Sequence, residues 1–107
     1  MNAPAVIIVG GGPAGLTAAA QLARTRRVLV LEREVGAGGI PRHSDHLGYG
    51  LRDRHRFLSG PAYARALAAA ARGAGAELRT EAMATGWTAD GGLAVTSPAG
   101  REELSAP

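Results

Sequence analysis

The feature that most constrains this chain is the stretch from Val6 to Ala20, VIIVGGGPAGLTAAA. An apolar, β-branched run leads directly into a cluster of glycines, and small residues at helical spacing follow Pro13. An unbroken apolar run of this length is typical of a strand buried on both faces of a parallel sheet. Proline is tolerated in the first turn of a helix, where an N–H group has no intrahelical partner. The stretch therefore predicts a strand, a tight glycine turn and a helix.

The glycines fit the dinucleotide fingerprint G-x-G-x-x-G at Gly10, Gly12 and Gly15. In that fingerprint the first glycine makes the turn, the second admits the pyrophosphate, and the third allows close packing of helix and strand. A second apolar strand, VLVL at 28–31, ends at Glu32, which is 22 positions after Gly10. An acid at roughly 20 positions binds the ribose hydroxyls. We interpret the unit as a dinucleotide cradle; the alternative is a glycine turn that serves packing alone.

At 107 residues the chain has room for one small domain. We expect an α/β fold: a Rossmann-like FAD/NAD(P)-binding domain with a parallel sheet and a small antiparallel β-meander, truncated within residues 1–107. Its predicted parts, in chain order, are a βαβ unit at 5–35, a glycine-rich loop at 36–60, a helix and third strand at 61–82, and the meander at 83–104.

Composition excludes several classes of function. The absence of cysteine excludes disulfides, thiolate metal sites and a cysteine nucleophile. All 12 basic residues are arginine, but they are scattered and aromatic residues are few, so we expect no nucleic-acid binding. The uncharged stretch 3–23 has no basic n-region and is interrupted by glycines and Pro13, so we predict neither a signal peptide nor a membrane span. We expect a cytoplasmic protein.

The segments GGGPAGLTAAAQLA and VLVLERE, followed by AGGIPRHSDHLGYGL and FLSGPAYARAL, resemble the N-terminal FAD segment of glutathione-reductase-like flavoproteins. This superfamily includes the pyridine nucleotide-disulfide oxidoreductases. The branch that the chain resembles lies near thioredoxin reductase, the anaerobic-type glycerol-3-phosphate dehydrogenases, and the opine or amino-acid oxidases. The resemblance runs from about Ala5 to Leu104. An acid at position 32, rather than a basic residue, argues against a 2′-phosphate and so against NADP.

The resemblance implies a row of residues along a bound FAD. The diphosphate would be lined by Gly10, Gly12, Pro13, Ala14 and Gly15. Glu32 would bind the adenosine ribose, with Arg33 beside it near the adenine. Gly39 and Ile40 would approach the ribityl chain and the flavin. Met83 would meet the adenine through its backbone.

The family pattern continues beyond this chain into a strand ending in A-T-G, a second dinucleotide domain and a late G-D motif. In a sheet ordered 3-2-1-4, the strand at 6–9 would then be an exposed edge. We expect a fragment: the FAD-binding portion of a flavin-dependent oxidoreductase that passes hydride from a small-molecule substrate to flavin, with NAD as a second nucleotide in a full-length protein. The 107 residues alone are expected to be inactive. The alternatives are a non-catalytic nucleotide-binding fragment or subunit completed by a partner chain, and a NAD-binding domain.

No catalytic residue is assigned by these patterns. Ligand-type side chains gather in the glycine-rich loop, namely His43, Asp45, His46 and His55. Their spacing matches no familiar metal site, so we expect no metal, and His43 and His46 are named as candidates for chemistry on position alone. The run from Arg52 to Arg56 is read as a solvated charged face, with binding of an anionic group as the alternative. Tyr63 and Trp87 are expected to pack under the second helix and in the core of the meander.

Overall fold

The computed structural model describes residues 3–39, 43 and 59–107. The expected βαβ unit consists of β1 (Val6–Val9), α1 (Pro13–Leu22) and β2 (Val28–Leu31). β1 and β2 pair in parallel, with Val6 opposite Val28 and Val9 opposite Leu31. The apolar runs thus form strands and the residues after Pro13 form a helix, as their patterns predict.

The third strand adds to the other side of β2. Helix α2 (Gly60–Gly73) leads into β3 (Glu77–Arg79), which pairs in parallel with β2 and gives the order β1-β2-β3. All four residues of β2 are buried, whereas β1 is only partly buried. The expectation of a strand buried on both faces therefore holds for β2 but not for β1. β1 is less covered because no strand in the described part of the chain pairs with its other edge.

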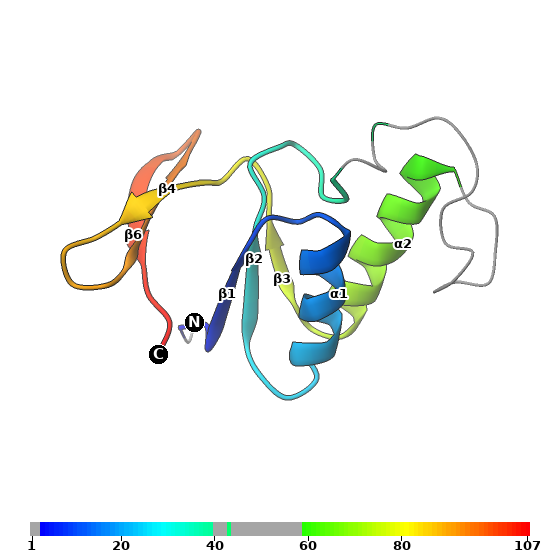
Figure 1. Cartoon of the computed structure of the whole chain (residues 1–107), viewed down its shortest axis with the longest axis horizontal. Coiled ribbons are helices and arrows are strands. Elements are labelled where there is room, and N and C mark those ends of the chain that lie inside the picture. Colours follow the sequence, from blue (N-terminus) through cyan, green and yellow to red (C-terminus); the bar gives the residue numbers. More distant parts are fainter. Residues whose placement is uncertain (1–2, 40–42, 44–58) are drawn as a thin grey trace.

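The two helices lie side by side on one face of this sheet (Figure 1). α2 begins at Ser59, whose Oγ accepts a hydrogen bond from the Ala62 N–H, and it has a proline in its first turn. Tyr63 packs partly buried against this helical core, as predicted. Small side chains let the helices approach closely. The buried core of this layer is Leu16, Ala19, Val28, Val30, Leu67, Ala68, Ala71 and Ala76.

The antiparallel meander covers the opposite face of the parallel sheet, so the molecule has three layers (Figure 1). Its strands are β4 (Met83–Trp87), β5 (Leu93–Ser97) and β6 (Gly100–Leu104), in the order β4-β5-β6. Val95 of β5 is fully buried against Leu29 and Leu31 of β2. The predicted α/β fold with a parallel sheet and a β-meander is confirmed.

Trp87 does not pack in the core of the meander, so that expectation is wrong. Its side chain is 82% exposed. Trp87 ends an edge strand of a three-stranded meander, and the buried positions of that meander are filled by Ala94 and Val95. The indole instead lines a shallow groove with Ile7 and Val9, beside β1.

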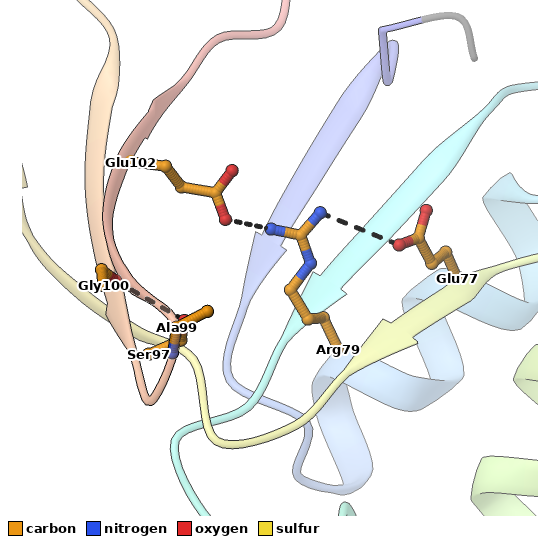
Figure 2. A network of polar contacts seen from close by, with 6 residues as sticks. All are labelled: Glu77, Arg79, Ser97, Ala99, Gly100 and Glu102. Carbon is orange, nitrogen blue, oxygen red and sulfur yellow. Dashed lines mark hydrogen bonds and ion pairs between the residues drawn. The ribbon is translucent and has the colours of Figure 1, made fainter.

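An ion pair also joins the two sheets. Figure 2 shows Arg79 of β3 between two carboxylates, with Nη1 2.5 Å from Glu102 Oε1 on β6 and Nη2 3.8 Å from Glu77 Oε2. These side chains are partly exposed, so solvent screens the pair, and exposed pairs contribute about 1 kcal/mol at most. Apolar burial rather than this contact holds the meander on the sheet.

The hairpin between β4 and β5 predicts a pH-dependent stability. The Thr88 hydroxyl donates to the Asp90 carboxylate and, with backbone N–H groups, lowers the pKa of Asp90. Because the folded state favours the charged form, this contribution is present above the ordinary pKa of aspartate and is lost as pH falls through the lowered value. Asp90→Asn should lower the melting temperature at pH 7 and should lower it less at an acidic pH below the ordinary pKa of aspartate.

Thermal melts followed by circular dichroism at the two pH values check this expectation. Thr88→Val removes the same hydroxyl, which also accepts from the Gly92 N–H, so it should destabilise the protein at both pH values and more strongly at pH 7. A destabilisation by Asp90→Asn that is equal at both pH values would contradict it.

Candidate dinucleotide-binding site

The glycine turn joins β1 to α1 at very close range. Gly10 has a φ of +104°, a conformation that favours glycine, and its N–H donates to the Leu31 carbonyl at 2.8 Å. A Cβ on Gly15 would lie 2.1 Å from the Gly10 carbonyl oxygen, so no larger residue fits there. A Cβ on Gly12 would meet nothing closer than 3.9 Å. Gly10 is thus required by its backbone conformation and Gly15 by the close approach of helix and strand. At Gly12, by contrast, the backbone is open to a ligand.

That open surface is the N-terminus of α1. Gly12 is the N-cap and Pro13 begins the helix, with no side-chain cap and no acid in the first turn. Helix geometry leaves the N–H groups of Ala14 and Gly15 without intrahelical partners. α2, by contrast, is capped by its preceding serine. The positive end of the α1 dipole therefore faces outward with donors to offer, an arrangement that suits a phosphate group.

Glu32 follows β2 directly and is held by four hydrogen bonds. Its backbone N–H donates to the Arg79 carbonyl, and its own carbonyl accepts from the Ala82 N–H, each at 2.9 Å. In the side chain, Oε1 accepts from the Gly11 N–H at 2.8 Å and Oε2 accepts from the Glu34 N–H at 2.9 Å. The residue is 9% exposed. An ionised carboxylate has about four acceptor positions, so two remain for a ligand.

A pocket of about 330 Å³ opens at the carboxyl ends of β1 and β2. In parallel α/β sheets this end of the strands is where ligands bind. Four residues named from the sequence come together here, Gly10, Glu32, Arg33 and Met83. The fingerprint predicts the first two, and the family resemblance implies the other two. The full lining is Val9, Gly10, Leu31, Glu32, Arg33, Ala82, Met83 and Ala84. The lining combines apolar side chains with polar groups, among them residues Glu32 and Arg33, which suits a flat base attached to a sugar.

The loop after β2 lies against the glycine turn. Gly39 has a φ of +67°, and a Cβ there would be 3.0 Å from Gly12 Cα and 3.2 Å from Pro13 Cδ. Gly38 donates its N–H to the Gly11 carbonyl at 2.6 Å. The structure thus places Gly39 beside the residues expected to line a diphosphate.

Other candidates from the glycine-rich loop lie outside the described residues, namely Ile40, Asp45, His46, His55 and the run 52–56. His43 is exposed, and its Nε2 lies 2.8 Å from Glu34 Oε1. Within residues 3–39, 43 and 59–107, no three histidine or acidic side chains gather at a metal-binding distance. Neither described helix combines the length and apolar character needed to cross a membrane.

Sequence reasoning missed the residues that complete the site from outside the fingerprint. Gly11 and Gly38 contact each other through their backbones, and Val9 forms one wall of the pocket. The available signal was the triple glycine, since the fingerprint needs no glycine at position 11. A backbone contact between residues 27 positions apart carries no other mark in the sequence.

The closeness of Gly15 to Gly10 predicts a large loss of stability on adding one methyl group. Gly15→Ala should lower the free energy of unfolding by about 3 kcal/mol, because the methyl meets backbone rather than a movable side chain. Urea unfolding followed by circular dichroism measures this change. Gly73→Ala is the matched control: its Cβ would meet nothing within 4 Å near the end of α2, so it should gain about 0.5 kcal/mol. Similar losses in both variants would contradict the expectation.

Comparisons with solved structures match the whole fold. The chain superimposes on BexE, studied for oxidation during BE-7585A biosynthesis, with 28% identity and a TM-score of 0.70 over 98% of this chain and 30% of that one. It matches the atypical thioredoxin reductase TRi from Desulfovibrio vulgaris Hildenborough with 26% identity and a TM-score of 0.73, over 96% of this chain and 33% of that one. It matches aklavinone-11 hydroxylase, solved with FAD and aklavinone, with 22% identity and a TM-score of 0.72, over 99% of this chain and 32% of that one.

The chain thus spans about a third of the length of these structures. The resemblance to FAD-dependent oxidoreductases drawn from the sequence is confirmed. No curated protein sequence matches the chain. A family model described as an NAD(P)-binding Rossmann-like domain matches residues 8–70, which is more than half of the sequence. The chain therefore belongs to the NAD(P)-binding Rossmann-like domain family.

Proposed function

We propose that this chain is the N-terminal FAD-binding segment of a flavin-dependent oxidoreductase. The observation that carries the proposal is the juxtaposition at the end of β1: a helix N-terminus without a side-chain cap at Gly12 and, directly after the neighbouring strand, a buried carboxylate at Glu32 beside a pocket. The first suits a diphosphate and the second suits the ribose of an adenosine.

The residues present fit the adenosine half of FAD. The N–H groups of Gly12, Ala14 and Gly15 would bind the diphosphate, and Glu32 would accept hydrogen bonds from the ribose hydroxyls. The adenine would lie in the 330 Å³ pocket beside Met83. The other residues named from the sequence, Gly10, Pro13, Arg33, Gly39 and Ile40, would border the diphosphate, the adenine and the ribityl chain.

The choice of FAD over a nicotinamide nucleotide rests on the extent of the match. A carboxylate accepts hydrogen bonds but repels a 2′-phosphate, so Glu32 disfavours NADP. The FAD complex of aklavinone-11 hydroxylase matches 99% of the chain, including the meander and the loop after β2. A NAD-binding domain alone would leave those two segments without a role.

In the complete enzyme, bound FAD would supply the redox chemistry by accepting hydride from a small-molecule substrate. This chain would contribute binding and orientation: the glycine turn fixes the diphosphate, Glu32 fixes the ribose, and the loop around Gly39 approaches the ribityl chain. We propose that catalytic residues lie in other parts of the enzyme, that the 107 residues alone are inactive, and that the protein acts in the cytoplasm.

The proposal predicts selective binding of FAD to the 107-residue chain. Flavin fluorescence and equilibrium dialysis should show that FAD binds more tightly than NAD, and NAD more tightly than NADP. Glu32→Ala should weaken FAD binding about tenfold or more, because it removes a charged hydrogen-bond acceptor, and should narrow the discrimination against NADP. Glu103→Ala, which removes an exposed glutamate of β6, is the control and should leave the affinity for FAD and the discrimination against NADP unchanged. A preference for NAD would overturn the assignment of FAD.

A second candidate function is a nucleotide-binding subunit that a partner chain completes. The observation in its favour is the unpaired edge of β1 in the described structure. Beside it lies a groove of about 230 Å³ lined by Ile7, Val9, Trp87, Leu93 and Leu104, among others. Val9 is 61% exposed. Edges of this kind tend to pair with another chain.

This candidate predicts association through the β1 edge. Val9→Lys should reduce self-association of the nucleotide-free chain in light scattering, because a charge on an edge strand opposes pairing. Val35→Lys is the matched control, since Val35 is similarly exposed (66%) but lies in the loop after β2. Equal effects of the two variants would show that general surface hydrophobicity, and not the β1 edge, drives association.

A further inference from the structure

The triple glycine contains one member for which the fingerprint has no use. Gly11 occupies a variable position of G-x-G-x-x-G, yet it is the buried member of the three, whereas Gly10 is exposed and Gly12 is half-buried. A Cβ at position 11 would lie 3.2 Å from each of three atoms: Ala37 Cβ, Glu32 Cβ and Glu32 Oε1. Such distances are tighter than ordinary van der Waals contact, so glycine allows the surrounding segments to close around it.

Both backbone polar groups of Gly11 are hydrogen-bonded within the protein. Its N–H donates to Glu32 Oε1 at 2.8 Å, and this bond is buried. Its carbonyl accepts from the Gly38 N–H at 2.6 Å. One residue of the turn is thereby tied on one side to the end of β2 and on the other to the loop that follows it.

We propose that Glu32 is a positioning residue for the glycine turn. Glu32, Gly11 and Gly38, joined by these two hydrogen bonds, are here called the clamp. The clamp holds the turn in its binding shape before any nucleotide arrives. Three successive glycines lose much conformational freedom on ordering, and a turn ordered in advance does not incur that cost during binding. The ligand part of this inference rests on the proposed function; the clamp itself does not.

The clamp and a ribose contact are compatible. Each oxygen of Glu32 accepts one backbone N–H group, from Gly11 at Oε1 and from Glu34 at Oε2, so each has a second acceptor position left. The carboxylate can therefore hold the turn and accept ribose hydroxyls at the same time. A neutral amide can satisfy one of the two N–H groups but not both.

The first measurement is amide hydrogen exchange by NMR on the nucleotide-free 107-residue chain. The Gly11 amide should be protected in the wild-type protein, relative to the Leu67 amide in the core of α2. In Glu32→Ala this ratio should fall at least tenfold, and Glu32→Gln should show a smaller loss. Glu103→Ala is the control and should leave the ratio unchanged. Normalising to Leu67 separates a local opening from a general loss of stability, and the glutamine variant carries the test if the alanine variant does not fold.

The second measurement isolates the clamp from the ribose contact. 2′,3′-Dideoxyadenosine diphosphate has a diphosphate but no ribose hydroxyls, so it cannot bond to Glu32. Glu32→Ala should still weaken its binding threefold or more in calorimetry, because the turn is no longer held. The same variant should weaken the binding of ADP by a larger factor than that of the dideoxy ligand, because ADP also loses its ribose contact with Glu32.

The outcomes separate the two proposals. A wild-type Gly11 amide that exchanges without protection, or a ratio that Glu32→Ala leaves unchanged, overturns the clamp. Unchanged binding of the dideoxy ligand to Glu32→Ala overturns its role in preparing the diphosphate site. A protected Gly11 in a chain that binds neither ADP nor FAD upholds the clamp and refutes the proposed function.

Discussion

The contact between the backbone of α1 and the carbonyl of Gly10 is the constraint on which the rest of the structure depends. Because Gly15 has no side chain, the helix can start directly over the end of β1. That closeness aims the first turn of the helix at the carboxyl end of the sheet, where the residue after β2 also lies.

Small side chains also allow close packing in the helical layer. Alanines at positions 19, 68 and 71 are buried between the helices and the sheet, so little side-chain volume separates them. The opposite face is covered by larger residues, since Leu29 and Leu31 meet Val95 of the meander. The parallel sheet therefore packs on one side mainly through alanines and on the other through larger side chains. The pocket beside Glu32 lies on the side of the meander, which contributes Met83 and Ala84.

Much of this arrangement could be predicted from the sequence, because short-range patterns encode it. The apolar run before Gly10, the helix after Pro13 and the acid at position 32 each follow from local rules. The exposure of Trp87 could not be predicted, since aromatic character indicates burial but does not show that the strand lies at the edge of its sheet.

The contact between Gly11 and Gly38 was equally hidden, because it joins backbone groups across 27 positions. No side-chain pattern records such a bond. The pocket likewise draws Met83 from a strand whose position depends on the packing of the meander. The glycine turn can be predicted from one segment of sequence. The lining of the pocket beside it cannot, because that lining depends on how the meander packs on the parallel sheet.

The position of that pocket couples ligand occupancy to the cohesion of the molecule. Its lining comes from two layers, with Leu31 and Glu32 belonging to the parallel sheet and Met83 and Ala84 to the meander. A molecule bound there touches both layers, so its binding free energy adds to their adhesion. Local opening of the seam between the layers and release of the ligand would then be one thermodynamically linked event.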